Sequence, residues 1–191
     1  METKTIDYKN IYYPPGGILL WIIIFLELIT FGIALIVLVI NSKDDPALFH
    51  ESRLQLNATF GAVNTVFLLT SGAFMAASVH QFKKRNFKKS TKFINFAMLG
   101  GLLFLILKGF EYYLKIESGH TLGFNSFFTF YWLLTGFHVI HVLVGLVILF
   151  STKLGLKKER TQLEDIEATA AFWHMCDLIW LLLFPVLYLI L

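Results

Sequence analysis

The sequence contains very little cysteine and little charge, and both deficits exclude classes of protein. Cys176 is the only cysteine among 191 residues, so the chain cannot form an internal disulfide or bind a metal ion with cysteines alone. Charged residues make up 15% of the chain, against about 25% in ordinary soluble domains. No glycine-rich dinucleotide loop follows a strand-like segment. These deficits argue against a disulfide scaffold, a disordered chain and a soluble α/β enzyme.

Apolar and aromatic residues take the place of the missing charge. They make up 57% of the chain, and the mean hydropathy is +0.68. Soluble domains contain about 45–50% apolar residues, and a soluble core of this size could not bury the excess. We therefore predict an integral membrane protein.

Five apolar windows are long enough to cross a bilayer, which takes about 20 residues each. Short polar connections separate them, and no other region is long enough to form a second domain. The first window contains Glu27 and lacks a small-residue cleavage site, so we expect a helix rather than a signal peptide. The sequence thus predicts an all-α bundle of five transmembrane helices, in a single domain over residues 1–191. The predicted spans cover about residues 17–40, 57–80, 93–116, 126–150 and 170–191.

Basic residues predict the orientation of the bundle in the membrane. Most of the sixteen lysines and arginines lie in the N-terminal segment and in the second and fourth connections. By the positive-inside rule, the N-terminus is cytoplasmic and the C-terminus lies outside. The second connection contains no acidic residue and could also bind anionic lipid head groups, although a topology signal alone is the simpler interpretation. The residues on this side are Lys4, Lys9, Lys83, Lys84, Arg85, Lys88, Lys89, Lys92, Lys153, Lys157, Lys158 and Arg160.

Several ionisable side chains fall at membrane depth, where each costs about 2.5–3.5 kcal/mol on the insertion scale. They should therefore face protein, water or one another. Three pairs have the i, i+3 spacing that brings side chains to one helix face. The pairs are Lys108 with Glu111, His138 with His141, and His174 with Asp177.

Each pair has a structural interpretation and a functional alternative. The lysine–glutamate pair predicts a buried salt bridge, with a proton or ion relay as the alternative. The histidine pair predicts hydrogen bonds between helices, or a metal site if other helices supply ligands. Haem is disfavoured there, because its axial ligands approach from opposite sides of the ring. The histidine–aspartate pair predicts a buried hydrogen-bonded contact that orients helices.

Other positions indicate a specific role or close packing. Glu27 lies near the middle of its span with no charged partner within one turn, which makes it a functional candidate; the alternative is a bond to a neighbouring helix or to lipid. Asn64 falls near the level of Lys108. Gly72 belongs to a small-xxx-small pattern that permits close helix contact. Trp173 and Trp180 flank the His174–Asp177 face and are expected to pack against it. We thus expect one buried polar network, made of Glu27, Asn64, Lys108, Glu111, His138, His141, His174 and Asp177.

Five segments, in order along the chain, resemble subunit III of the haem–copper oxidases. Thr135–Val142 is similar to that family's TGFHxxHV segment, and Phe172–Leu181 to its (Y/F)WHxxDxxW helix. Asn64–Gly72 resembles the NTxxLLxSG helix. Glu111 and Tyr112 match its EY pair, and Glu27 falls where the family carries a buried glutamate.

The resemblance implies a supporting role in a respiratory complex. Mitochondrial-type members have seven helices, and this chain, which lacks the first two, is similar to the five-helix forms of bacterial plasma membranes. Lys108 and Pro185 depart from the long forms. Subunit III carries no haem or copper, so no catalytic, cofactor or metal residue is expected here; those groups belong to partner subunits. The family docks on the haem-bearing subunit I, holds phospholipids and helps sustain proton uptake during aerobic respiration.

Three alternatives remain open at this point. A NorE-like accessory of a nitric oxide reductase would share the same motifs. An independent proton-coupled transporter would use Glu27, Glu111 and Asp177 as a relay, although the chain has no internal repeat and no pair of broken helices. A di-metal membrane enzyme would use His138, His141 and His174 as ligands.

Overall fold

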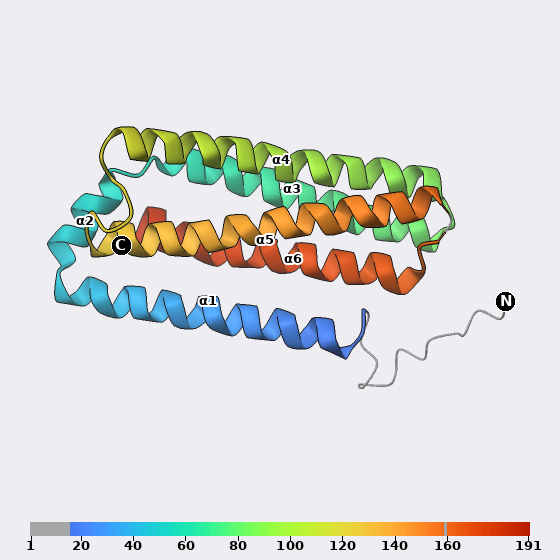
Figure 1. The fold of residues 1–191 in the computed structure, drawn as a ribbon, viewed down its shortest axis with the longest axis horizontal. Helices are drawn as coiled ribbons and strands as arrows, with labels where there is room; N and C mark the ends of the chain where they lie inside the picture. The colour runs from blue at the N-terminus through green and yellow to red at the C-terminus, as the bar shows by residue number, and fades with distance from the viewer. Residues whose placement is uncertain (1–15, 159) are drawn as a thin grey trace.

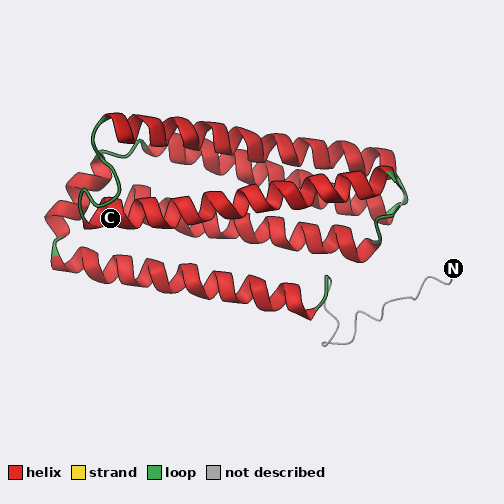
Figure 2. Ribbon diagram, viewed as in Figure 1, coloured by secondary structure: helices red, strands yellow, loops and turns green. Residues whose placement is uncertain are grey.

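The described residues form a bundle of long helices in a computed structural model (Figures 1 and 2). The structure describes residues 16–158 and 160–191, so Lys4 and Lys9 of the charge pattern lie outside it. Five of its helices are long and apolar enough to cross a membrane, which confirms the predicted all-α fold with five spans. The elements are α1 (Ile18–Asp44), α2 (Pro46–Leu54), α3 (Ala58–Lys83), α4 (Phe87–Glu117), α5 (Ser126–Lys157), α6 (Leu163–Pro185) and the π-helix η1 (Val186–Ile190).

The helices extend beyond the apolar windows because capping residues, rather than hydrophobicity, set their ends. Asn86 accepts a hydrogen bond from the Lys89 backbone N–H, so α4 begins six residues before its predicted start at residue 93. Gln162 and Asp165 form a capping box that starts α6 at Leu163 rather than at residue 170. The first turns of α4 and α6 are polar, so a prediction that counts only apolar residues misses them.

The sequence analysis missed two short elements. The side chain of Asp45 accepts the Leu48 N–H at 3.1 Å, and Pro46 occupies the first turn of α2, an arrangement typical of a helix start. At the other end of the chain, Pro185 lacks an N–H and interrupts the α-helical ladder. The following residues form η1, which buries Leu187 and Tyr188.

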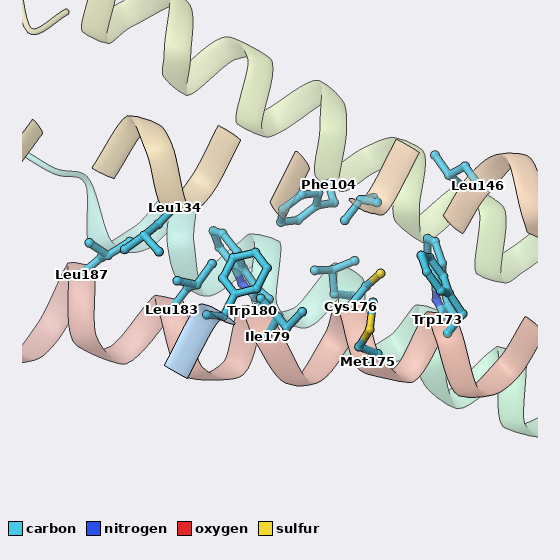
Figure 3. Packing of buried hydrophobic residues seen from close by; sticks show 14 of the residues in the cluster. Phe104, Leu134, Leu146, Trp173, Met175, Cys176, Ile179, Trp180, Leu183 and Leu187 are labelled. Atoms are coloured by element: carbon cyan, nitrogen blue, oxygen red, sulfur yellow. The ribbon is translucent and has the colours of Figure 1, made fainter. Parts of the chain in front are cut away.

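α6 contacts α1, α3 and α5 and has more buried side chains than any other described helix. The hairpin of α3 and α4 contacts α6 and α5, while α1 runs along one edge of the bundle and contacts α5 and α6 (Figure 1). Figure 3 shows the core side chains of α6, among them Trp173 and Trp180, beside Phe104 of α4 and Leu146 of α5. The α3–α4 and α5–α6 connections lie at the end of the bundle where α1 begins (Figure 1). The basic second and fourth connections therefore share one end of the molecule.

Candidate functional site

The side chains of Lys108 and Glu111 form a fully buried ion pair on α4. The Lys108 Nζ lies 3.1 Å from Glu111 Oε2, and the two residues are 0% and 1% exposed. The Lys108 ammonium also donates to the hydroxyl oxygens of Tyr131 at 3.1 Å and Tyr188 at 2.7 Å. Both hydroxyls in turn donate to Glu111 Oε1, at 2.9 and 2.6 Å. All three N–H donors of the ammonium therefore form hydrogen bonds. A buried ion pair needs such additional hydrogen bonds to offset the cost of removing its charges from water.

Tyr131 and Tyr188 are the members of this cluster that the sequence analysis missed. Tyr131 lies on α5 and Tyr188 on η1, so the cluster ties three elements together at one end of the bundle. Tyr131 stands seven residues before His138, two helical turns away on the same face. That spacing marks it as inward-facing, but no pattern in one sequence relates it to Lys108. The closed geometry favours the salt-bridge interpretation over a relay.

The side chain of Glu27 has an ionisable partner on a different helix. Nε2 of His141 lies 3.2 Å from Glu27 Oε2, which links α1 to α5. Nδ1 of His141 lies 2.8 Å from the Phe137 carbonyl oxygen, which can only accept, so Nδ1 carries a hydrogen. The side chains of His141 and Glu27 are 12% and 24% exposed, so this pair lies near the surface of the bundle.

The third pair lies at the contact between α3 and α6. Nδ1 of His174 is 3.2 Å from Asp177 Oδ2, and the carboxylate is buried while the imidazole is partly exposed. Asp177 Oδ2 sits directly against Gly72, where a Cβ atom would overlap with it. The glycine thus admits the carboxylate between the two helices.

We expect Asp177→Ala to lower the free energy of unfolding by about 1–3 kcal/mol, because the substitution removes a buried hydrogen-bonded partner from between two helices. Thermal melting of the purified chain in detergent would measure the change. Glu164→Ala, at an exposed position in the first turn of α6, is the control. An equal or higher melting temperature for Asp177→Ala would contradict the prediction, since it would mean that desolvation of the carboxylate outweighs its contact with His174.

His138 and Asn64 are fully buried and have no hydrogen-bond partner within the described residues. The imidazole of His138 stacks on Trp180, with ring centres 5.4 Å apart, and meets the edge of Phe104 at 5.6 Å. His138 therefore faces α4 and α6, whereas His141 faces α1. The two histidines do not converge on one point, and the described part of the chain contains no group of three or more metal-binding side chains.

The predicted network is divided in space. Within residues 16–158 and 160–191, no hydrogen bond joins the Lys108 cluster, the Glu27–His141 pair and the His174–Asp177 pair to one another. Trp180 lies between His138 and the Lys108 cluster. Its ring stacks on His138 and its centre lies 5.4 Å from the Lys108 Nζ, while its Nε1 donates to Thr65 Oγ1 at 2.9 Å. Trp180 therefore packs in the core rather than on the His174–Asp177 face.

A sequence model of a known family matches most of this chain. The family is described as cytochrome c oxidase subunit III, and the match runs over residues 56–190, well over half of the chain. The chain belongs to this family. The matched range contains every candidate residue except Glu27, which lies before it on α1. The family indicated by the sequence motifs is thereby confirmed.

Individual members of the subunit III family are also similar to the chain. It is 32% identical over 129 residues to cytochrome c oxidase subunit 3 of Drosophila melanogaster, covering 66% of this chain and 48% of the relative. The protein of the same name from Artemia franciscana is 33% identical over 128 residues, covering 66% and 49%. That from Rhipicephalus sanguineus is 31% identical over 132 residues, covering 66% and 49%. The chain thus spans about half the length of the curated relatives it matches.

Proposed function

We propose that this chain is a non-redox subunit III of a bacterial haem–copper terminal oxidase. In this role it docks on the haem-bearing subunit I and supports assembly, lipid binding and proton uptake while that subunit reduces oxygen. The family match over residues 56–190 is the observation that carries the proposal. Haem and copper belong to the partner subunits, and the complex belongs to the bacterial plasma membrane.

The distribution of charge supports the proposed orientation, with the N-terminus in the cytoplasm. The α3–α4 and α5–α6 connections lie at the same end of the bundle and carry most of the basic residues (Figure 1). The opposite end carries only Lys43, Arg53 and Lys115 among the described lysines and arginines. Cytoplasmic loops are enriched in lysine and arginine, so the basic end is assigned to the cytoplasm.

The positions of the polar side chains favour a structural role over a catalytic one. The Lys108 cluster is closed and satisfied, which suits it to fixing helices. The Glu27–His141 pair differs, because it is partly exposed and links α1, with its few buried side chains, to the rest of the bundle. A partly exposed ionisable pair on the side of the bundle is suited to a role in proton supply or lipid contact.

Affinity purification of the chain from native membranes in mild detergent tests this function. Mass spectrometry should identify oxidase subunit I, and a reduced-minus-oxidised spectrum should show its haem bands. Recovery of nitric oxide reductase subunits instead would favour the NorE-like alternative. A chain that purifies without any haem-bearing partner would contradict the proposal, and proton flux into liposomes by the isolated chain would then support a transporter.

We expect Glu27→Ala to leave membrane insertion intact but to shorten the lifetime of the complex under turnover or to weaken its lipid retention. The reason is that His141 loses its ionisable partner on α1. Activity decay of the purified complex and its phospholipid content would measure the effect. His141→Ala should reproduce it, and the double variant should be no worse than either single variant, because paired residues act as one unit. Unchanged decay and lipid content would reject the prediction.

A further inference from the structure

A series of closely spaced tyrosine and tryptophan rings runs from the core toward the end of the bundle that carries the α4–α5 connection. The ring centre of Trp180 lies 6.3 Å from that of Tyr188, and Tyr188 lies 6.4 Å from Tyr131. The ring of Trp132 lies 5.8 Å from that of Tyr131, and its Nε1 donates to the His120 carbonyl oxygen in the α4–α5 connection. Tyrosine and tryptophan side chains can each lose a single electron, and electrons pass readily between rings this close. The four rings therefore form a connected path for one electron.

Two of these tyrosines are bonded to a group that can take their proton. The hydroxyls of Tyr131 and Tyr188 both donate to Glu111 Oε1, at 2.9 and 2.6 Å. A carboxylate accepts hydrogen bonds and can take up a proton along one that already exists. A tyrosine that loses an electron becomes a strong acid, so oxidation is easiest where a base already contacts the hydroxyl. Tyr131 and Tyr188 meet this requirement in the interior of the bundle.

Tyr112 has the same neighbours but lacks such a base. Its ring lies 6.2 Å from Tyr131 and 4.5 Å from Trp132, and 5.1 Å from the Lys108 Nζ. Its hydroxyl donates to Thr135 Oγ1 at 2.8 Å, and that hydroxyl in turn donates to the Tyr131 carbonyl oxygen. Neither acceptor is basic enough to take a proton. Tyr112 therefore shares the ring contacts of the other two tyrosines without their proton acceptor.

The charge of Lys108 determines which oxidised form the cluster can hold. Its Nζ lies 4.7 Å from the ring centre of Tyr131 and 5.4 Å from that of Tyr188. A ring that lost an electron and kept its proton would place a second positive charge beside the buried ammonium, which is costly at low dielectric. Transfer of the hydroxyl proton to Glu111 keeps the ring neutral. Because Lys108 then lacks its counter-charge, only a strong one-electron oxidant can oxidise the cluster.

We propose that Tyr131, Tyr188 and Glu111 form a redox-active site that accepts one oxidising equivalent from an oxygen-centred radical, such as the hydroxyl radical. The hydroxyl radical takes one electron from Trp132, on the half-buried side of α5, and one proton from the solvent, and becomes water. Tyr131 replaces the electron on Trp132, and its hydroxyl proton moves to Glu111 Oε1. The products are a neutral tyrosyl radical and a neutral carboxyl group. A one-electron reductant such as ascorbate reverses both transfers, because Glu111 returns the proton.

A reversible site of this kind protects the chain from oxidative damage. An electron deficit left on the half-buried Trp132 is open to further reaction at the edge of the bundle, whereas a tyrosyl radical enclosed with Glu111 and Lys108 persists until it is reduced. The proton stays within the cluster, so the site is not a proton relay across the membrane. The site goes beyond the proposed function and does not depend on which respiratory complex the chain joins.

Flash photo-oxidation of the full-length chain in detergent tests the site, with photogenerated ruthenium(III) tris-bipyridine as the one-electron oxidant. Electron paramagnetic resonance of freeze-quenched samples distinguishes tyrosyl from tryptophanyl radicals. The test chain keeps three of the seven tyrosines, Tyr112, Tyr131 and Tyr188, so that a tyrosyl signal can come from these positions alone. Phenylalanine replaces the other four, Tyr8, Tyr12, Tyr13 and Tyr113.

We expect the test chain to give a tyrosyl signal that ascorbate removes. Adding Tyr131→Phe with Tyr188→Phe should lower its yield roughly tenfold or more, because a positioned proton acceptor contributes about 100-fold or more to proton transfer. The matched control, Tyr112→Phe, removes a hydroxyl that has no such acceptor and should change the yield by less than about twofold. The signal should form more slowly in deuterium oxide, because the hydroxyl proton moves together with the electron.

Four results would overturn the proposal. A purely tryptophanyl signal in the test chain would show that the tyrosines do not accept the oxidising equivalent. Equal yields in the paired variant and in Tyr112→Phe would show that contact with Glu111 does not matter. Equal rates in water and deuterium oxide would show that the hydroxyl proton stays in place. If the paired variant does not fold, Tyr131→Phe and Tyr188→Phe are measured singly; each should give a tyrosyl signal with a changed line shape, and an unchanged line shape in both would assign the radical to Tyr112.

Discussion

Replacing Lys108 with methionine is expected to lower the free energy of unfolding by about 3–5 kcal/mol, because the substitution leaves the Glu111 carboxylate buried without its counter-charge. The carboxylate would keep only its bonds from Tyr131 and Tyr188, and both hydroxyls would lose the ammonium that donates to them. The end of α4, the start of α5 and the π-helix η1 should therefore separate first. Unfolding of the purified chain in mixed micelles, followed by circular dichroism, would measure the loss.

Two further variants separate the charge from the shape of the cluster. Adding Glu111→Gln to Lys108→Met removes the unpaired charge but retains an oxygen that accepts both tyrosine hydroxyls, so it should restore part of the lost stability. Lys89→Met, on the same helix but exposed, should change stability by about 0.5 kcal/mol or less. If Lys108→Met were as stable as the natural chain, the ion pair would not fix the helices.

The sequence could predict contacts within one helix but not contacts between helices. Lys108 with Glu111, and His174 with Asp177, were predictable because three residues along an α-helix always bring two side chains near one face. The partners of Glu27 and Lys108 on other helices depend on how each helix is rotated about its axis. In a soluble protein an amphipathic pattern sets that rotation, but these spans are apolar on all sides, so the pattern is weak.

The two histidines of α5 show the limit of the spacing argument most clearly. Their spacing places them about 60° apart around the helix, which permits a shared site but does not require one. In the bundle this angle is enough to direct His138 toward Phe104 and Trp180 and His141 toward Glu27. The five spans were predictable from the lengths of the apolar segments. The family motifs were predictable because each is a short local sequence. The neighbours of each histidine are decided by tertiary packing alone.

Trp173→Ala is expected to cost about 3–5 kcal/mol of unfolding free energy, because it empties a large volume at a point where four helices meet. Trp173 of α6 packs against Gly101 of α4 and Gly145 of α5, so closely that a Cβ atom at either glycine would lie 2.7–2.8 Å from the ring. Its Nε1 donates to Ser71 Oγ on α3 at 3.0 Å, and that hydroxyl donates to the Ala97 carbonyl oxygen of α4 at 2.6 Å. Thermal melting and unfolding in mixed micelles would measure the loss.

Matched variants divide this cost between volume and hydrogen bonding. Trp173→Phe keeps most of the ring and loses the N–H bond, so it should cost only about 0.5–1.5 kcal/mol. Gly145→Val tests the same contact from the other side, because its branched side chain would press on the Trp173 ring; overpacking of this kind costs about 1–3 kcal/mol. Trp132→Ala, on the half-buried side of α5, should cost less than Trp173→Ala. An equal loss of unfolding free energy in Trp173→Ala and Trp132→Ala would contradict the central role of Trp173. It would show that a tryptophan buried among four helices stabilises the bundle no more than one at its edge.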